Sequence, residues 1–368
     1  MSLPPHAPTP ATPTLPLSAA ALGSNVVWAD PQRQSHFFQW LASLPTDLGL
    51  QAASLTLASA DASFRRYLRI ASARGSLVIM DAPPDKEDCK PFVQVDRLMQ
   101  AAGLRVPEVL AWEQAQGFLL LSDLGRQTML QGMDLQAAPP LDQYLEAADL
   151  LLQWQLASKP DVLPAYDQAM LRRELELFPQ WYVAQHRQLV LDEKQRATLD
   201  QAFERILQNN LSWPSVYVHR DFMPRNLMLS PQGMGVLDFQ DAVYGPITYD
   251  IASLMRDAFL SWDEEFCLDV TIRYWQKARK AGLPVGDDFG AFYQGVEWMG
   301  LQRHLKIAGI FARLTLRDGK PQYLADTPRF IHYIRSTCSR YMALKPLLRL
   351  VEAIEGIEVP TAFVFGRF

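Results

Sequence analysis

The sequence predicts an α+β chain with two lobes, a small antiparallel β-sheet lobe followed by a larger, mainly helical one. Three observations support this prediction. Residues 51–125 carry short, strand-like apolar runs, whereas residues 141–210 and 262–350 carry apolar residues at helical spacing. The length of 368 residues also exceeds the roughly 250–300 residues at which a single hydrophobic core stops growing.

The small lobe is predicted to span residues 26–124, after a disordered tail rich in Pro, Ala and Thr at 1–25. Its first three antiparallel strands are predicted by the apolar runs at 54–59, 64–72 and 76–83. Residues 86–103 then show helical spacing that stops at a glycine. Two further apolar runs around the turn at Gln116–Gly117 complete a sheet with one helix inserted after its third strand.

The larger lobe is predicted to span residues 125–368. Its helical stretches are interrupted at "SKPDVLP", "GLPVGDD" and "RDGKPQ", where Pro and Gly end helices. Between the helical blocks, residues 216–239 read as strand, loop, strand, loop, in which the strand at 227–230 has 235–239 as its hairpin partner. The lobe is therefore helical with a short β insert.

The composition excludes several classes of protein. The net charge of −5 argues against nucleic acid as the main partner, and no apolar run reaches the roughly 20 residues of a membrane helix. Three widely spaced cysteines match neither a zinc site nor a disulfide framework, which indicates a reducing compartment. The N-terminus lacks the positive start and apolar centre of a secretion signal. We expect a cytoplasmic protein without membrane or nucleic-acid partners.

Polar residues follow two neighbouring strands of the β insert. Asp221 and Asn226 lie in the loop of "VHRDFMPRNLML", and Asp238 ends the strand in "VLDFQDAVYGP". A carboxylate and a carboxamide that meet here offer the hard oxygen ligands that Mg²⁺ prefers beside phosphate and water. A second carboxylate on the same loop could contact an incoming hydroxyl. These are the parts that phosphoryl transfer needs.

The spacing His219-x-Asp221-x₄-Asn226, followed by Asp238 and its phenylalanine, resembles the catalytic loop of the protein-kinase-like superfamily, in its aminoglycoside/choline phosphotransferase branch. The resemblance implies a bilobal protein-kinase-like fold that uses ATP and Mg²⁺. It also implies that Asp221 is the catalytic base and that Asn226 and Asp238 bind the metal. Asp250 would hold the catalytic loop through backbone N–H groups, and His219 would be structural.

The nucleotide side is predicted in the small lobe. "LLLSDLG" at 119–125 has the form of the branch's hinge, so the backbone of Ser122, Asp123 and Leu124 would pair with adenine. A strand that ends in an Asx turn explains the same residues equally well. The turn after the first strand would cover the phosphates, with contacts expected from three of its residues, Ser59, Ser63 and Arg66.

The chain departs from the superfamily pattern on the third strand. "SLVIMDAP" has Met80 where a phosphate-binding lysine is expected. Either another cation replaces it, or the strand register differs, or the protein binds nucleotide without turnover. The candidate cations are Arg65, Arg66, Lys86 and Lys90.

The acceptor site is predicted in the helical lobe, where residues 292–314 combine aromatic and polar side chains. An amphipathic helix with solvated charges is the alternative reading. Eight segments between residues 58 and 324 resemble the bacterial anomeric sugar kinases of cell-wall recycling. This resemblance implies ATP-dependent phosphorylation of N-acetylmuramate and N-acetylglucosamine at C1 and a uridylyltransferase that uses the product. The expected acceptor contacts are Asp241, Glu297, Arg303, His304 and Arg313.

Other acceptors remain open at this point, because choline and aminoglycosides are substrates of the same branch. An aminoglycoside is polycationic, and residues 292–314 have one acidic residue against four Lys, Arg or His residues. A choline site needs an aromatic and acidic cage, for which Trp298 and Glu297 are candidates. The sequence does not fix the preference between the two sugars.

Overall fold

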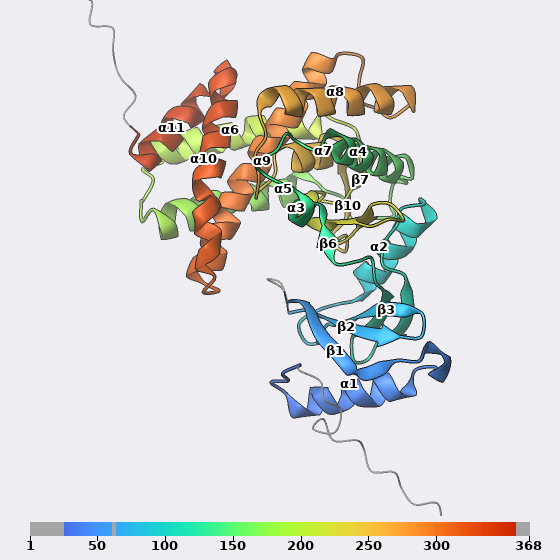
Figure 1. Ribbon diagram of the computed structural model, residues 1–368. Coiled ribbons are helices and arrows are strands. Elements are labelled where there is room, and N and C mark those ends of the chain that lie inside the picture. The colour runs from blue at the N-terminus through green and yellow to red at the C-terminus, as the bar shows by residue number, and fades with distance from the viewer. Residues whose placement is uncertain (1–25, 61–63, 358–368) are drawn as a thin grey trace, which may run out of the picture. The chain divides into compact units, whose positions relative to one another are not determined.

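A computed structural model describes residues 26–60 and 64–357. The chain divides into two compact units, one that extends to Val93 and includes Pro107–Asp123, and a larger one of Gln94–Val106 and the residues from Leu124 onward (Figure 1). The smaller unit is an antiparallel sheet and the larger is mostly helical, which confirms the predicted α+β class. The predicted tail and Ser63 lie outside the described residues.

The smaller unit is built on a five-stranded sheet in the order β1-β2-β3-β5-β4, with every neighbouring pair antiparallel. The predicted strands and the helix after the third strand are all present. Their bounds are β1 (Gln51–Ala60), β2 (Arg66–Ser72), β3 (Gly75–Asp81), α2 (Lys90–Ala101), β4 (Val109–Glu113) and β5 (Phe118–Ser122). Residues of α2 from Gln94 onward group with the larger unit.

Helix α1 (Pro31–Ser43) was not predicted and covers one face of this sheet (Figure 1). The Asp30 carboxylate caps it by accepting from the Gln32 N–H at 2.8 Å, and proline occupies the first turn. Phe37 and Trp40 pack in the core against the sheet with Phe118. In the sequence, this helix is indicated by its Asp-Pro start and by apolar residues three and four positions apart.

The strand register assigns side chains to the two faces of the sheet. Met80 pairs with Tyr67 and Leu119 and is fully buried. Because successive residues point to opposite faces, Tyr67 and Met80 share the face away from α1. Arg66 lies on the α1 face with its partner Asp81.

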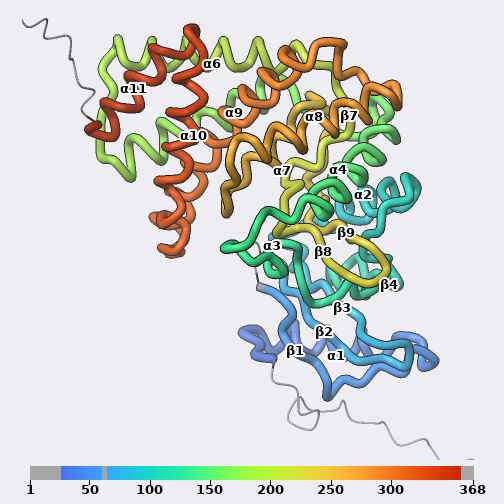
Figure 2. Tube along the Cα trace, turned by 45° about the horizontal axis from the view of Figure 1, so that its top comes forward, coloured from blue at the N-terminus to red at the C-terminus, as the bar shows by residue number. Residues whose placement is uncertain are grey.

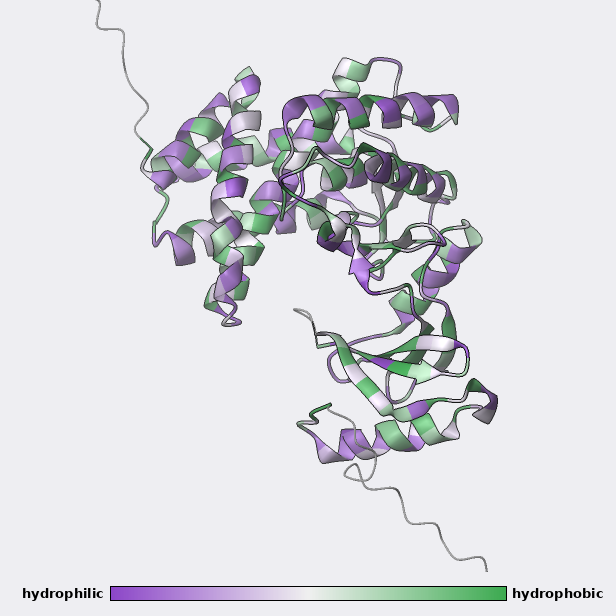
Figure 3. Ribbon diagram, viewed as in Figure 1, coloured by the Kyte–Doolittle hydropathy of each residue, from purple (hydrophilic) through white to green (hydrophobic). Residues whose placement is uncertain are grey.

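The larger unit is built from amphipathic helices that alternate hydrophilic and hydrophobic residues along their lengths (Figure 3). The long helix α9 (Phe289–Leu316) packs against several of the others, among them α10 (Thr327–Arg340), which in turn contacts α11 (Lys345–Glu355) (Figure 2). The predicted breaks at 158–164, 282–288 and 317–322 all separate helices. The remaining helices are α3 (Met129–Gly132), α4 (Leu141–Leu156), α5 (Gln168–Leu175), a π-helix (Phe178–His186), α6 (Glu193–Leu211), α7 (Thr248–Met255) and α8 (Glu264–Lys280).

Short strands interrupt the helices and position the loop of interest. They form two small sheets: β6 (Gln127–Thr128), β8 (Leu227–Leu229) and β9 (Gly235–Val236) in one, and β7 (Ser215–Val218) with β10 (Val243–Pro246) in the other. The predicted hairpin is present as β8 and β9, which pair antiparallel. The loop of Asp221 therefore leaves β7 and enters β8. None of the described helices is both long and apolar enough to cross a bilayer.

Candidate active site

The loop after β7 is held by one buried carboxylate. Asp250, in the first turn of α7, accepts from the backbone N–H of His219 at 2.6 Å and of Arg220 at 3.0 Å. Arg220 has φ +78°, a left-handed conformation that costs free energy and turns both N–H groups toward one acceptor. Burial raises the pKa of Asp250, and the two backbone N–H donors oppose this rise.

His219 is part of the framework of the loop. Its Nδ1 accepts from the Asp221 N–H at 3.2 Å, so its Nε2 carries the proton and donates to the Leu237 carbonyl at 2.9 Å. Burial lowers the pKa of the imidazole, which keeps it neutral. Both ring nitrogens are thus engaged with backbone groups, and the histidine joins the loop to the strand that leads to Asp238.

Asn226 and Asp238 meet beside the loop. The Asn226 amide donates from Nδ2 to the Asp221 carbonyl at 2.9 Å and to Asp238 Oδ2 at 3.4 Å. These bonds fix the amide so that Oδ1 is its remaining ligand atom. Asp238 has φ +63°, the second left-handed residue of the site, and accepts from Gln240 at 2.9 Å. The predicted metal ligands are therefore brought together by two strained backbone positions.

The donor set of this pair fits a magnesium ion. One carboxylate and one carboxamide supply hard oxygens, and Mg²⁺ completes its shell with water and phosphate. Within the described parts of the chain, no group of three or more His, Cys, Asp or Glu side chains could hold a metal ion.

Three cations act on the half-buried carboxylate of Asp221. Burial alone would raise its pKa, but the positive charges of Lys306, Arg303 and Arg220 outweigh burial and hold the pKa below its ordinary value. Arg303 of α9 donates from Nη1 to the Arg220 carbonyl at 2.6 Å. Asp221 is thus ionised at neutral pH, as a proton acceptor must be.

Buried Glu174 of α5 holds two of these cations, Lys306 and Arg220, in place. Lys306 Nζ lies 3.1 Å from Glu174 Oε1, and Arg220 and Tyr166 also donate to this carboxylate. Burial raises the pKa of Glu174, but Lys306 and Arg220 more than compensate and lower it. Glu174 and Lys306 were not predicted from the sequence. The sequence does indicate that Arg303 and Lys306 share a helix face, because they are three residues apart on one helix.

Comparisons with known proteins agree with this geometry. A sequence profile of the phosphotransferase enzyme family matches residues 54–288. The chain belongs to the phosphotransferase enzyme family. An N-acetylmuramate/N-acetylglucosamine kinase from Neisseria meningitidis serogroup B is 48% identical over 338 residues, which cover 91% of this chain and 100% of the relative. A kinase of the same name from Pseudomonas putida is 49% identical over 305 residues, 83% of this chain and 89% of the relative.

A solved structure shares the fold of this phosphotransferase. An amicoumacin kinase in complex with AMP-PNP, Ca²⁺ and Ami superimposes with a TM-score of 0.55 and covers 80% of this chain and 92% of its own. At 16% identity the likeness shows the fold alone. The predicted kinase-like fold is therefore confirmed.

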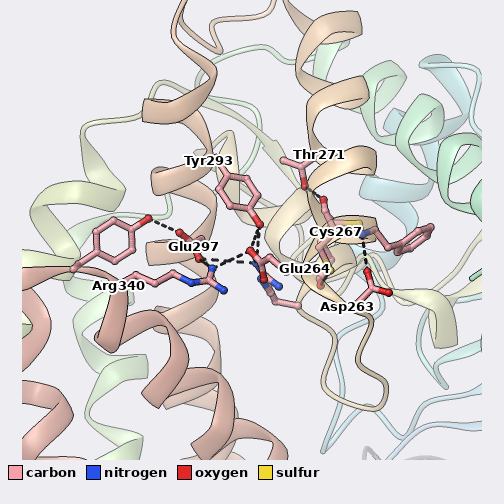
Figure 4. Close-up of polar contacts among 11 residues, drawn as sticks. Asp263, Glu264, Cys267, Thr271, Tyr293, Glu297 and Arg340 are labelled. Carbon is pink, nitrogen blue, oxygen red and sulfur yellow. Dashed lines mark hydrogen bonds and ion pairs between the residues drawn. The ribbon is translucent and has the colours of Figure 1, made fainter.

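Glu297, a predicted acceptor contact of this phosphotransferase, is part of a structural network (Figure 4). It is 4% exposed and accepts from Arg340 and from the Tyr341 hydroxyl. Arg340 also donates to Glu264 at 2.9 Å, and Tyr293 donates to the same carboxylate. The network joins α8, α9 and α10, so the structure gives Glu297 a role in helix packing.

The other predicted acceptor residues lie in different surroundings. His304 is buried, stacks on Tyr333 at 4.5 Å and bonds to the Arg256 carbonyl, and burial lowers its pKa to about 3. Arg313 is half-buried near the end of α9, and burial lowers its pKa. Asp241 is exposed. Of the five residues, Arg303 is the one whose charge acts most directly on Asp221.

Most of the predicted nucleotide-binding side chains of the smaller unit form hydrogen bonds or ion pairs with other protein groups. The Ser122 hydroxyl accepts from the Glu108 N–H at 2.8 Å, and the Asp123 carboxylate accepts from Arg69 at 2.6 Å. Ser59 is exposed on β1. Arg66 is tied to Asp81 on the α1 face, away from the face of Met80, and this placement gives no support for a phosphate contact. Buried Leu124, already in the larger unit, packs beside Gly235.

The Asp250→Asn variant tests the loop framework. The amide retains one acceptor oxygen, so one of the two buried N–H groups loses its charge-assisted bond. We expect a loss of about 2 kcal/mol in the free energy of unfolding, because such bonds contribute about 1.5–3 kcal/mol each. Urea denaturation followed by circular dichroism measures this. An unchanged midpoint would mean that the carboxylate does not hold the loop.

Proposed function

We propose that this phosphotransferase transfers the γ-phosphoryl group of ATP to the C1 hydroxyl of N-acetylmuramate and N-acetylglucosamine. The observation that carries the proposal is the identity of 48% to a kinase of that name, over the whole length of the relative. At this level of identity and coverage, the acceptor pocket is expected to be retained together with the fold. The arrangement of Asp221, Asn226 and Asp238 supplies the chemistry.

ATP and Mg²⁺ are the proposed co-substrate and metal. The amicoumacin kinase that shares the fold holds AMP-PNP and Ca²⁺, a nucleotide with a divalent cation. In this chain, Asn226 and Asp238 would hold the ion, and the backbone of Ser122 and Asp123 would hold the adenine. A bound Mg²⁺ offsets the negative charge of the phosphates and orients them.

Asp221 acts on the acceptor. Its carboxylate binds the C1 hydroxyl and accepts the proton as the hydroxyl oxygen bonds to the γ-phosphorus. The bond from that phosphorus to the bridging oxygen breaks, and ADP leaves with the electron pair. An anomeric hydroxyl is more acidic than an ordinary alcohol, so a carboxylate with a lowered pKa is a sufficient base. Arg303 and Lys306 keep this carboxylate ionised.

The charge around Asp221 supports a neutral or anionic acceptor. The carboxylates of Asp221, Glu174 and Asp250 are balanced by the three cations Arg220, Arg303 and Lys306. A polycationic aminoglycoside or a choline would need a surplus of negative charge beside the reacting hydroxyl. The lactyl carboxylate of N-acetylmuramate suits a site in which arginine is available.

The proposed product is a substrate for a second enzyme. An α-1-phosphate is the substrate form that a uridylyltransferase needs to make a UDP-sugar, as in cell-wall recycling. We assign the reaction to the cytoplasm, where ATP is available and where Cys89, Cys267 and Cys338, all buried and unpaired with one another, remain reduced.

The position of the phosphate in the product tests the proposal. The purified chain is incubated with ATP, Mg²⁺ and N-acetylmuramate, and the product is examined by phosphorus-31 and carbon-13 NMR. We expect coupling of the phosphate to C1, with N-acetylglucosamine giving the same result. A phosphate on C6, or turnover with choline or an aminoglycoside in place of either sugar, would refute the assignment.

A further inference from the structure

The third strand of the sheet cannot supply a phosphate-binding cation. Met80 occupies the position where kinases carry a lysine, and its exposed fraction is zero. Its pairing with Tyr67 on one side and Leu119 on the other fixes the register. The missing charge therefore has to come from another element.

Arg65 immediately precedes β2, two residues before Tyr67. Tyr67 is the partner of Met80 and shares its face of the sheet. This is the face away from α1. Arg65 also ends the segment between β1 and β2, which is the part of the sheet where the sequence predicts contact with phosphates.

An acidic residue from just before α2 orients the Arg65 guanidinium. Its Nε and Nη2 donate to Glu87 Oε2 at 3.1 and 2.9 Å. The two side chains are 13% and 14% exposed, so the pair is largely shielded from water. The backbone N–H of Phe64 donates to the other oxygen of Glu87 at 3.3 Å. A cation fixed by an acid at the helix after the third strand reproduces the lysine–glutamate pair of kinases with different residues.

The other cations described in the smaller unit have different positions. Arg33 and Arg66 bind Asp81 on the α1 face. Arg69, in the middle of β2, binds Asp123 at 2.6 Å. The rest are exposed at the surface: Arg74, Lys86 and Lys90.

We propose that Arg65, oriented by Glu87, binds the phosphates of the nucleotide in place of the missing lysine. A guanidinium has five N–H donors, and the bond to Glu87 uses two of them. Its planar fork matches two phosphate oxygens, and its charge persists at every physiological pH. The inference rests on the proposed use of ATP and is independent of the acceptor sugar.

Nucleotide affinity without turnover tests this proposal. Isothermal titration calorimetry compares adenosine, ADP and ATP, with Mg²⁺ and without sugar, for the full chain and for Arg65→Met. We expect the ATP affinity to fall about 10- to 100-fold, the range for loss of a charge-assisted bond. The adenosine affinity should stay within about twofold. Arg65→Lys should retain more ATP affinity than Arg65→Met, and Glu87→Gln should weaken ATP by a smaller factor than Arg65→Met.

The Arg74→Met variant is the matched control, because Arg74 is an exposed arginine of the same unit, 3.4 Å from Asp47. It should bind all three ligands like the wild type. Equal losses for adenosine and ATP in Arg65→Met and Arg65→Lys would show that Arg65 is only structural and overturn the proposal, as would unchanged ATP affinity. A wild type that binds ATP but phosphorylates no sugar would contradict the proposed acceptor and leave the role of Arg65 intact.

Discussion

Replacing Asp221 by Asn is expected to lower kcat for N-acetylmuramate about 10³-fold, within the range for loss of a general base. The amide has nearly the same shape but cannot accept the proton of the C1 hydroxyl. The KM for ATP should change little, because Asp221 is assigned to the acceptor. ADP release in a coupled assay measures both constants.

The pH dependence gives a second readout for Asp221. Its pKa is lowered in the fold, so the carboxylate stays ionised until the pH falls below the ordinary aspartate value of about 3.9. Wild-type kcat should therefore show no loss from this group between pH 8 and 5. Asp269→Asn, an exposed change on α8, is the control and should behave like the wild type. If kcat of Asp221→Asn stayed within tenfold of the wild-type value, Asp221 would not be the general base.

The Asp238→Asn variant should lose at least about 10³-fold in kcat. Metal stabilisation of phosphoryl transfer contributes several kcal/mol, and each 1.36 kcal/mol is tenfold in rate. Asparagine tolerates the left-handed backbone at φ +63°, so the loop conformation is expected to survive while the charge is lost. Rates measured over a range of Mg²⁺ concentrations should show half-saturation moved to a higher concentration.

An unchanged Mg²⁺ requirement in Asp238→Asn would mean that the ion binds elsewhere. Circular dichroism and the thermal midpoint separate this outcome from a general folding defect. Asp269→Asn again serves as the matched control, since it makes the same chemical change far from the loop in sequence and on an exposed helix face.

The parts of the fold that depend on local patterns could be predicted from the sequence. The strands of the sheet, the hairpin of β8 and β9 and the helix breaks all follow from short apolar runs and from Pro and Gly. The meeting of Asn226 and Asp238 could also be anticipated, because a hairpin brings the residues before and after its strands together. Helix α1 follows the predicted tail and was not predicted, although its cap is recognisable in the sequence.

The partners of individual charges could not be predicted. Glu297 binds Arg340, which is 43 residues away, and Arg66 binds Asp81 across a strand pair. Periodicity places a residue on a face, but the choice of partner depends on which element packs there. The sequence alone does not show whether Glu297 and Arg66 bind a substrate or form structural ion pairs, because their neighbours are set by the packing of other elements.

We assign the metal ion that binds the nucleotide to Asn226 and Asp238, and the acceptor to Asp221, and this assignment can be tested. Titration of Mn²⁺ in the presence of ADP, followed by electron paramagnetic resonance, tests it most directly. We expect ADP-dependent Mn²⁺ binding in the wild type and in Asp221→Asn, and a loss of at least about tenfold in affinity in Asp238→Asn and Asn226→Ala. Equal Mn²⁺ affinity in all four proteins would contradict the account.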